Sequence, residues 1–418
     1  MTIKITTPNG GADSLDFGCA QTAIVATVTG TEVSSGEGKL ELKTTTGGTS
    51  ATKMTIAANG DATFTGDVSI ASLNGGQLAG NRNRIINGNM MIDQRNTGAA
   101  YTLTGDSQYN VDRFKGRTYG GSGRFSAQQV TDAPDGFLKS LKVTVTTTNT
   151  SGTYGYSLEQ QLEGLNIIDF NFGSASAKTY TMSFWVKASI AGTYTCANRT
   201  LGGGASCVFT YTIDSVNTWE KKTFTFPANT GFTTGTDNGI GLICDFGFGP
   251  QTSKLTSTLG AWQSGNYLFN SGQVDLMATS GATFYITGVQ LERGSVATPF
   301  EHRGYGTELA LCQRYYQQYG PHGNTMVGDG VTYNSTTAHR WGFELPVVMR
   351  VAPTGVLSGT CGLWNGASIG GSAVLGTNYT KPEMVQYDMT CNSGLINTTG
   401  LRMSMYLNTG TFTASAEL

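Results

Sequence analysis

Strict alternation of apolar and polar side chains is the feature of this sequence that most constrains its fold. Residues 180–187 read YTMSFWVK, and every second residue is large and apolar: Tyr180, Met182, Phe184 and Val186. Successive side chains of a β-strand point to opposite faces, whereas a helix would spread these four around its circumference. The segment therefore predicts a strand with one buried face.

The same pattern recurs from about residue 100 to 300, interrupted by turns rich in Gly, Asn and Ser. Seven or more such strands need a partner surface on which to bury their apolar faces, and two sheets packed face to face provide it. We therefore expect an all-β protein with a central jelly-roll β-sandwich over residues 81–303. Other clear examples lie at 141–145, 208–213, 223–226, 239–248 and 282–292.

Residues 1–80 contain strand-like pieces and turn dipeptides such as Asn59-Gly60 and Gly66-Asp67. The pieces, for example Thr63–Thr65 and Val68–Ile70, are only three to five residues long. Strands this short cannot close a core within one chain, so we expect copies of the segment to intertwine around an axis as the shaft of a homotrimer. Heptad repeats are absent from the sequence, which argues against a coiled-coil stalk.

One segment, TPFEHRGYGTELALCQRYYQQYG at 298–320, predicts a helix. Thr307 can cap its N-terminus and Glu308 lies in the first turn, while Gly320 stands where the helix must end. Apolar residues recur at spacings of three, four and three. We expect a connecting helix over 304–320 that holds a C-terminal β-rich distal domain, 321–418, at a fixed angle. The recurring residues are Leu309, Cys312, Tyr316 and Tyr319.

The low charge and the absence of recognisable targeting signals limit the classes of partner and the location that we expect for this protein. Only 13% of the residues are charged and the formal net charge is −2, so there is no electrostatic reason to expect nucleic acid or an anionic membrane surface as a partner. No apolar run approaches the ~20 residues of a membrane-spanning helix, so we expect no membrane insertion. The opening MTIKITTPNG lacks the basic and apolar regions of a secretory signal, and we expect folding in a cytoplasm.

The seven cysteines are an odd number, and none forms a CxxC pair, which argues against zinc or redox sites. Most are expected to be small buried apolar residues. Cys196 and Cys207 flank the turn LGGGAS, and a disulfide across this hairpin is the alternative to two free thiols. We favour the free thiols.

Acidic residues and histidines show no catalytic or metal-binding pattern. Cleavage of a polysaccharide needs two carboxylates about 5–10 Å apart, and the three histidines His302, His322 and His339 lack the HxxxH spacing. Asp112 is expected to pair with Arg113 or another cation rather than bind calcium. We expect neither enzyme activity nor a metal or cofactor. The other acids considered are Asp106, Asp132, Asp135, Glu159 and Glu163.

Binding of a sugar requires less: an exposed aromatic ring and a few polar groups around it. Trp262 lies among polar neighbours in LGAWQSGN, and Trp341 and Trp364 lie in the last domain, the former close to His339. These four residues are the candidate receptor or glycan site. For each tryptophan the alternative is packing in a core.

Several motifs, in their order along the chain, resemble the fibre proteins of tailed bacteriophages, especially those with a jelly-roll similar to carbohydrate-binding modules. Phe114 stands where such proteins usually have Trp after the Asp-Arg pair, a substitution of similar size. Residues 1–80 resemble fibre shafts only in their general pattern of short strand-like pieces and turns, and not through a specific motif. The motifs lie at 81–95, 112–114, 183–187, 288–294, 297–301, 311–316 and 344–354.

This resemblance implies a virion fibre protein that is assembled in the host cytoplasm as a homotrimer. Its N-terminus is expected to join other tail or adaptor proteins of the virion, and another part to bind a host surface glycan or lipopolysaccharide during adsorption. The alternative is a purely structural or capsid-decorating virion protein. A polysaccharide depolymerase is the third hypothesis.

Overall fold

The computed structural model divides the chain into two compact units, residues 1–73 and 74–418. β-Strands dominate both, which confirms the all-β prediction. The structure describes residues 13–17, 26–34, 37–46, 49–65, 81–201, 204–320, 325–335, 338–359, 361–364, 369–370, 373–391, 402–407 and 410–418.

The described part of the first unit is a five-stranded antiparallel sheet in the order β1-β2-β3-β4-β5. Its central strands have 9, 10 and 8 residues, so the prediction of strands of only three to five residues is wrong for them. The prediction failed because these strands are rich in threonine and contain few apolar residues, so apolar alternation did not mark their full length. Threonine itself favours strands. The strands are β1 (Asp13–Phe17), β2 (Ala26–Ser34), β3 (Glu37–Thr46), β4 (Thr49–Ile56) and β5 (Ala62–Phe64).

Apolar side chains gather on one face of this sheet. Leu42 is paired with Val28 on β2 and with Met54 on β4, and Met54 is paired with Phe64 on β5. Directly paired residues of an antiparallel sheet share a face. Leu42 and Phe64 are 37% and 46% exposed, so the described residues of the unit leave this apolar face open.

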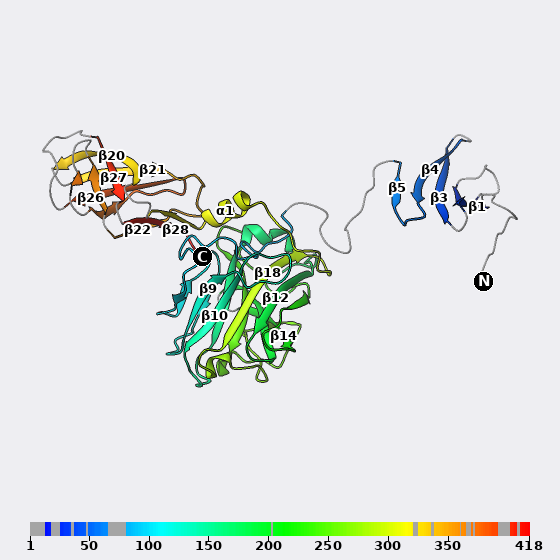
Figure 1. The fold of residues 1–418 in the computed structure, drawn as a ribbon, viewed down its shortest axis with the longest axis horizontal. Helices are drawn as coiled ribbons and strands as arrows, with labels where there is room; N and C mark the ends of the chain where they lie inside the picture. Colours follow the sequence, from blue (N-terminus) through cyan, green and yellow to red (C-terminus); the bar gives the residue numbers. More distant parts are fainter. Residues whose placement is uncertain are drawn as a thin grey trace. The chain divides into compact units, whose positions relative to one another are not determined.

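Two antiparallel sheets form a β-sandwich in the second unit (Figure 1), which confirms the predicted central sandwich. The orders are β15-β12-β18-β10-β9-β6 and β17-β14-β13-β16-β11-β8-β7. Consecutive strands such as β10 and β11 lie in different sheets, consistent with a jelly-roll. The bounds are β6 (Tyr101–Thr102), β7 (Ser107–Tyr109), β8 (Lys115–Arg117), β9 (Arg124–Val130), β10 (Ser140–Thr147), β11 (Tyr156–Glu163), β12 (Tyr180–Ala188), β13 (Gly192–Arg199), β14 (Ala205–Ile213), β15 (Glu220–Phe226), β16 (Ile240–Gly249), β17 (Trp262–Ser264) and β18 (Thr283–Arg293).

The sandwich core lies between the two sheets. The alternating apolar residues of β12 all point into it and are fully buried. Phe184 of β12 meets Phe246 of β16 edge to face, with ring centroids 5.0 Å apart. Tyr180 stacks between Phe170 and Phe226 at 5.0 and 5.1 Å. Each such aromatic pair contributes about 0.5–1.5 kcal/mol beyond the area that it buries.

Cysteines contribute to this core as thiols. In the hairpin of β13 and β14, Cys196 is paired with Phe209 and Cys207 with Asn198, so the two cysteines lie diagonally rather than opposite one another. Diagonal neighbours are about 7–8 Å apart, which is too far for a disulfide. The prediction of free thiols is confirmed. The free, buried cysteines are Cys196, Cys207, Cys244 and Cys312.

Asn87 organises the segment 81–96. Its φ of 60° lies in the left-handed region that Asn tolerates better than most residues. The buried side chain donates to the carbonyls of Ile92 and Asp112 at 2.8 and 2.9 Å and accepts from the Ile92 N–H at 2.9 Å. The Asn87 N–H donates to the Glu308 carboxylate. One asparagine thereby joins this segment to the sandwich and to the helix.

Helix α1 (Tyr305–Gln313) has nine residues and is shorter than the predicted helix over 304–320. Residues 316–319 form strand β19 (Tyr316–Tyr319) instead, paired with β28. The predicted extension through Tyr319 is therefore wrong. Tyrosine favours strands, and the pairing of Tyr319 with Phe412 places its ring on the C-terminal core.

The C-terminal part contains two further sheets, in the orders β19-β28-β22 and β24-β23-β27-β20-β21-β26-β25. They share a second core around Trp341, Phe343 and Phe412. The strands are β20 (Thr325–Ser335), β21 (Ala338–Glu344), β22 (Thr354–Ser358), β23 (Cys361–Trp364), β24 (Ile369–Gly370), β25 (Ala373–Asn378), β26 (Met384–Cys391), β27 (Arg402–Leu407) and β28 (Thr411–Ser415).

Ion pairs and stacked rings join this part to the sandwich. The Arg113 guanidinium lies 3.5 Å from the centre of the Tyr315 ring and pairs with Glu417. Arg95 lies 3.6 Å from the centre of the Tyr316 ring and pairs with Glu417 at 2.6 Å. Since Arg113 and Glu417 are nearly fully buried, removing one would leave the other unpaired, at a cost of about 3–5 kcal/mol.

Candidate functional site

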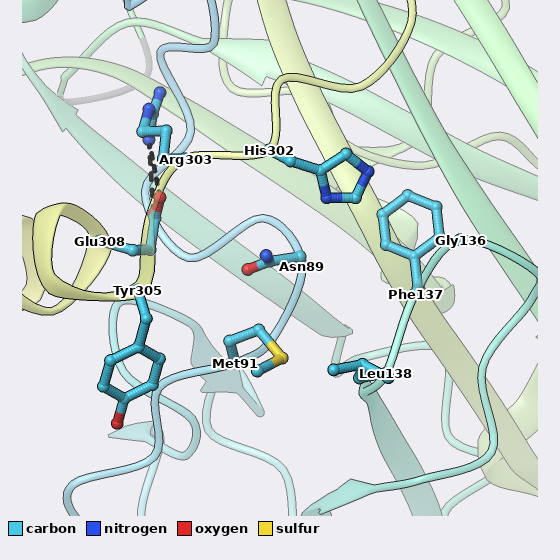
Figure 2. Close-up of a pocket in the computed structure, with 9 residues that line it drawn as sticks. All are labelled: Asn89, Met91, Gly136, Phe137, Leu138, His302, Arg303, Tyr305 and Glu308. Carbon is cyan, nitrogen blue, oxygen red and sulfur yellow. Dashed lines mark hydrogen bonds and ion pairs between the residues drawn. The ribbon is translucent and has the colours of Figure 1, made fainter.

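A cavity of about 190 Å³ lies where three segments of the second unit meet (Figure 2). One is the segment organised by Asn87, the second is the turn before β10, and the third leads into α1. The cavity is lined by Asn89, Met91, Gly136, Phe137, Leu138, His302, Arg303, Tyr305 and Glu308.

Three rings form an aromatic corner at this cavity. Gly136 has a φ of +86°, which favours glycine, and the Phe137 N–H donates to the Pro134 carbonyl at 3.1 Å. This tight turn directs Phe137 toward His302 (Figure 2). The ring centroid of Phe137 lies 5.1 Å from that of Phe300 and 5.5 Å from that of His302. Phe300 and His302 are 4.9 Å apart.

An ion pair forms the opposite wall. Arg303 Nη1 lies 3.2 Å from Glu308 Oε2, and Glu308 is a buried residue in the first turn of α1 (Figure 2). Arg303 also donates to the carbonyls of Asn83 and Ile85. Both charged side chains are thus held by several protein contacts, which makes this wall a rigid part of the site.

Asn89 supplies a polar atom that lacks a partner. Asn89 Oδ1 is buried and, like Arg303 Nε, has no hydrogen-bond partner among the described residues. The side chain lies between the Arg303–Glu308 pair and His302 in Figure 2. An unpaired buried polar atom costs about 1–3 kcal/mol. A ligand hydroxyl that donates to Oδ1 would remove that cost.

The remaining lining is apolar and open to solvent. Leu138 and Tyr305 are 72% and 60% exposed, and Met91 lies close by. Binding sites for small ligands combine apolar and aromatic walls with a few polar groups that orient the ligand. A sugar has C–H faces that pack on rings and hydroxyl groups that form hydrogen bonds, so the cavity has the chemistry to hold one sugar unit.

The residues predicted from the sequence lie elsewhere. Trp262, at the start of β17, is half-buried: its Nε1 donates to the Pro227 carbonyl at 3.0 Å, and its ring packs edge-on against Phe172. Trp364 ends β23, and its side chain lies outside the described residues. Trp262 does not line the cavity, and it packs against the sandwich core while Trp341 belongs to the C-terminal core.

Trp341 and His339 require a correction. Both are 0% exposed, and Trp341 packs 5.3 Å from both Phe343 and Phe412 while its Nε1 donates to the Val327 carbonyl. Burial also lowers the pKa of His339, which favours a neutral ring. A fully buried ring cannot stack on a sugar, so the packing alternative holds for Trp341.

Sequence reasoning did not assign the cavity residues to a site. His302 was expected only to bind no metal, and no role was predicted for Phe137 or Tyr305. The signal that was available is the run of aromatic and charged residues at 298–308, directly before the helix. The turn at 134–138 lies more than 160 residues away in sequence, and no periodicity predicts that the two meet.

Of the six acidic residues named as candidates from the sequence, four are held in ion pairs: Asp112, Asp132, Glu159 and Glu163. Glu159 of β11 is paired with Asp245 of β16, and Arg199 donates to both carboxylates at 2.7 Å. The two acids are 0% and 1% exposed. Burial raises the pKa of Asp245 to about 6, whereas for Glu159 the charges of Arg199 and Lys115 outweigh burial and lower the pKa. Asp112 pairs with Arg95, as expected for a structural carboxylate.

No group of three or more His, Cys, Asp or Glu side chains among the described residues is arranged to hold a metal ion. Likewise, none of the helices in the described ranges has both the length and the apolar character needed to cross a membrane.

No family model matches the chain, and no curated protein matches it. Among solved structures, the enzymatically active domain of bacteriophage CBA120 tailspike protein 4 is similar at 12% identity over 51% of this chain, with a TM-score of 0.28; the match spans 21% of that domain. A family 11 carbohydrate-binding module from Clostridium thermocellum is similar at 16% identity over 48% of this chain and 98% of the module, with a TM-score of 0.25. A family 30 carbohydrate-binding module is similar at 12% identity over 51% of this chain and 91% of the module, also with a TM-score of 0.25.

Proposed function

We propose that the chain is a virion fibre protein of a tailed bacteriophage and that it binds a host cell-surface glycan or lipopolysaccharide during adsorption. The observation that carries the proposal is the cavity of Figure 2, with its aromatic corner and the unpaired Oδ1 of Asn89. Asn89 and Met91 belong to the first of the motifs that resemble such fibres, and Phe300 belongs to a later one. The resemblance and the cavity thus point to the same part of the chain.

The proposed receptor site is in the sandwich rather than in residues 321–418. Trp341 and His339 are buried there, so neither offers the exposed ring that a C-terminal site was expected to use. In the cavity, by contrast, Tyr305 is 60% exposed and faces a space large enough for part of a ligand. A single sugar held in this way binds weakly, and several linked copies strengthen binding by ~10²–10⁴.

The test compares adsorption to host cells for Tyr305→Ala, Asn89→Ala and the control Tyr379→Ala. Tyr379 is also an exposed tyrosine, 41% accessible, but it lies outside the cavity. We expect adsorption to fall about tenfold for each cavity variant, which corresponds to about 1.4 kcal/mol, and to stay unchanged for the control. Wild-type adsorption by both cavity variants, with their fold intact, would refute the proposed site.

We also propose a homotrimer whose N-terminal part joins other tail or adaptor proteins in the virion after assembly in the host cytoplasm. The support is the open apolar face of the β1–β5 sheet, because burying such a face contributes roughly 25 cal/mol per Å². Light scattering should give three times the 44.1 kDa of the chain. Leu42→Asp combined with Phe64→Asp should lower that mass. A wild-type mass of one chain, with an intact β-sheet circular dichroism signal, would contradict the trimer.

We propose that this fibre binds glycans without cleaving them. One neighbouring acid pair, Glu159 and Asp245, is buried and bound to Arg199. Incubation with host capsule or lipopolysaccharide should release no oligosaccharide. Release that an Asp or Glu substitution abolishes would instead support a depolymerase. A purely structural or capsid-decorating protein would show neither release nor adsorption.

A further inference from the structure

A row of aromatic rings follows the outer face of the six-stranded sheet. The ring centroids of Trp219 and Tyr285 lie 6.1 Å apart, and Lys187 Nζ is 5.1 and 4.4 Å from them. Lys187 on β12 is paired with Tyr285 on β18. Trp219 Nε1 donates to Asp132 Oδ1 at 3.2 Å, and Lys187 pairs with the other oxygen of Asp132. These contacts hold both rings in place while each stays half-buried.

The row continues through Trp185 to the cavity. Trp185 lies two residues before Lys187 and therefore on the same face of β12. A Cβ at Gly288 would lie 3.0 Å from Trp185 Cδ1 and 2.7 Å from Phe137 Cζ, and Gly288 has a φ of +61°. Glycine lets the two rings approach the backbone between them. Phe137 belongs to the aromatic corner, so the row ends at the cavity.

The length of this row suits more than one sugar. Tyr285 and Gly288 are three residues apart on β18, which corresponds to about 10 Å along the strand. The cavity, with Phe137 and His302 on its edge, extends the same line. A linear oligosaccharide can therefore contact the rings of the row and the cavity together.

Lysines outnumber carboxylates along the row. Lys142 Nζ lies 5.7 Å from the ring of Tyr285, and Lys221, which is exposed, is paired with Trp185. Lys187 is neutralised by Asp132, whereas neither Lys142 nor Lys221 forms a salt bridge within the described part of the chain. The whole chain has a net charge of −2, so this positive surplus is local. Charge complementarity favours an anionic ligand.

We propose that the row binds an acidic saccharide chain, one that carries carboxylate groups, with one of its sugars in the cavity. The proposal rests on the proposed glycan-binding function and specifies the class of glycan. The rings of Trp185, Trp219 and Tyr285 contact sugar faces, while the ammonium groups of Lys142 and Lys221 attract the carboxylates. An exposed ion pair strengthens binding by about 1.4-fold to fivefold, so the two lysines together account for a preference of about twofold to thirtyfold.

The experiment uses the full chain on an array that pairs uronic-acid and sialic-acid oligosaccharides with their carboxyl-reduced, neutral counterparts. We expect at least one acidic oligosaccharide to bind about tenfold more tightly than its neutral counterpart in 50 mM salt, and this preference to shrink in 500 mM salt. Lys142→Gln combined with Lys221→Gln should abolish the preference without changing the binding of the neutral form. Lys381→Gln, an exposed lysine outside the row, is the control. Trp219→Ala should weaken binding of both forms.

Three outcomes would overturn the inference. Equal binding of each acidic and neutral pair would show that the lysines do not select the ligand. Tighter binding of a single-stranded oligonucleotide than of any saccharide would assign the rings and lysines to another ligand class. If no oligosaccharide binds while adsorption still depends on Tyr305, the acidic row fails and the proposed function stands. If adsorption is independent of Tyr305 as well, both fail.

Discussion

Replacing Trp341 by Ala separates a core role for this residue from a role in binding. The indole is fully buried, lies 5.3 Å from the rings of Phe343 and Phe412, and donates a hydrogen bond to the Val327 carbonyl. Truncation of a buried Trp to Ala costs about 3–5 kcal/mol because contacts are lost and a cavity remains. The orphaned carbonyl adds to this cost where water cannot reach it.

The expected result is selective loss of the C-terminal core. A loss of about 4 kcal/mol is a large fraction of the 5–15 kcal/mol that stabilises a typical domain. In a region of about 100 residues it corresponds to a drop in melting temperature of at least about 16 °C. Far-UV circular dichroism should show an early transition, and limited proteolysis with mass spectrometry should place the first cuts after residue 316. The sandwich core, which contains none of these residues, should melt at a higher temperature than the C-terminal core, although below its wild-type value because Arg95 and Arg113 lose their pairs with Glu417.

The matched control is Tyr379→Ala, which removes an exposed ring from the same part of the chain and should change stability by less than about 1.5 kcal/mol. Trp341→Phe should lie between the two, because it keeps a ring but loses the hydrogen bond. The reasoning is refuted if Trp341→Ala melts like the wild type and loses adsorption, since that result requires an accessible indole that contacts the receptor.

Three further predictions concern the sandwich. Burial raises the pKa of Asp112 to about 7 against the opposing charge of Arg95, so the folded state holds an extra proton between about pH 4 and pH 7. This stabilisation is complete below about pH 4 and is lost as the pH rises through 7. Urea unfolding should show the decline, at most about 4 kcal/mol, and Asp112→Asn should flatten it. Burial raises the pKa values of the Cys196 and Cys207 thiols, so iodoacetamide should label them only after unfolding, with no disulfide detected. Gly288→Ala should destabilise the sandwich by about 1–3 kcal/mol in chemical denaturation, because a methyl group there meets Phe137 and Trp185 at a φ of +61°.

A specific experimental result would contradict each of these three predictions. Equal pH dependence of the wild type and Asp112→Asn between pH 4 and pH 7 would mean that the folded-state carboxylate is already charged throughout this range. Rapid labelling of Cys196 in the native protein would place its thiol at the surface. A neutral Gly288→Ala would show that Phe137 can move away from β18, and the aromatic corner would then be flexible.

The sequence by itself determined the parts of the structure that depend on local periodicity. Alternation in residues 180–187 predicted a strand and its buried face, because side chains of a strand alternate whatever the strand packs against. Glu308 and Cys312 marked a helix for the same kind of reason, although its end was misplaced and its N-cap is Gly304 rather than the predicted Thr307. There, Tyr316 and Tyr319 fit a helix by spacing and a strand by propensity, and pairing with β28 decided between the two.

Only the tertiary structure decided which side chains form the candidate site. Phe137, His302 and Asn89 come from three segments far apart in sequence. A buried hydrogen bond from Asn87 to Glu308 joins two of these segments, and the contacts of the Phe137 ring with Phe300 and His302 add the third. No pattern in a single segment encodes such a meeting. Trp341 shows the converse. Tryptophan is suited both to stacking on a sugar and to filling a core. In this fold, the surrounding rings and the carbonyl that accepts a hydrogen bond from the indole give Trp341 the core role.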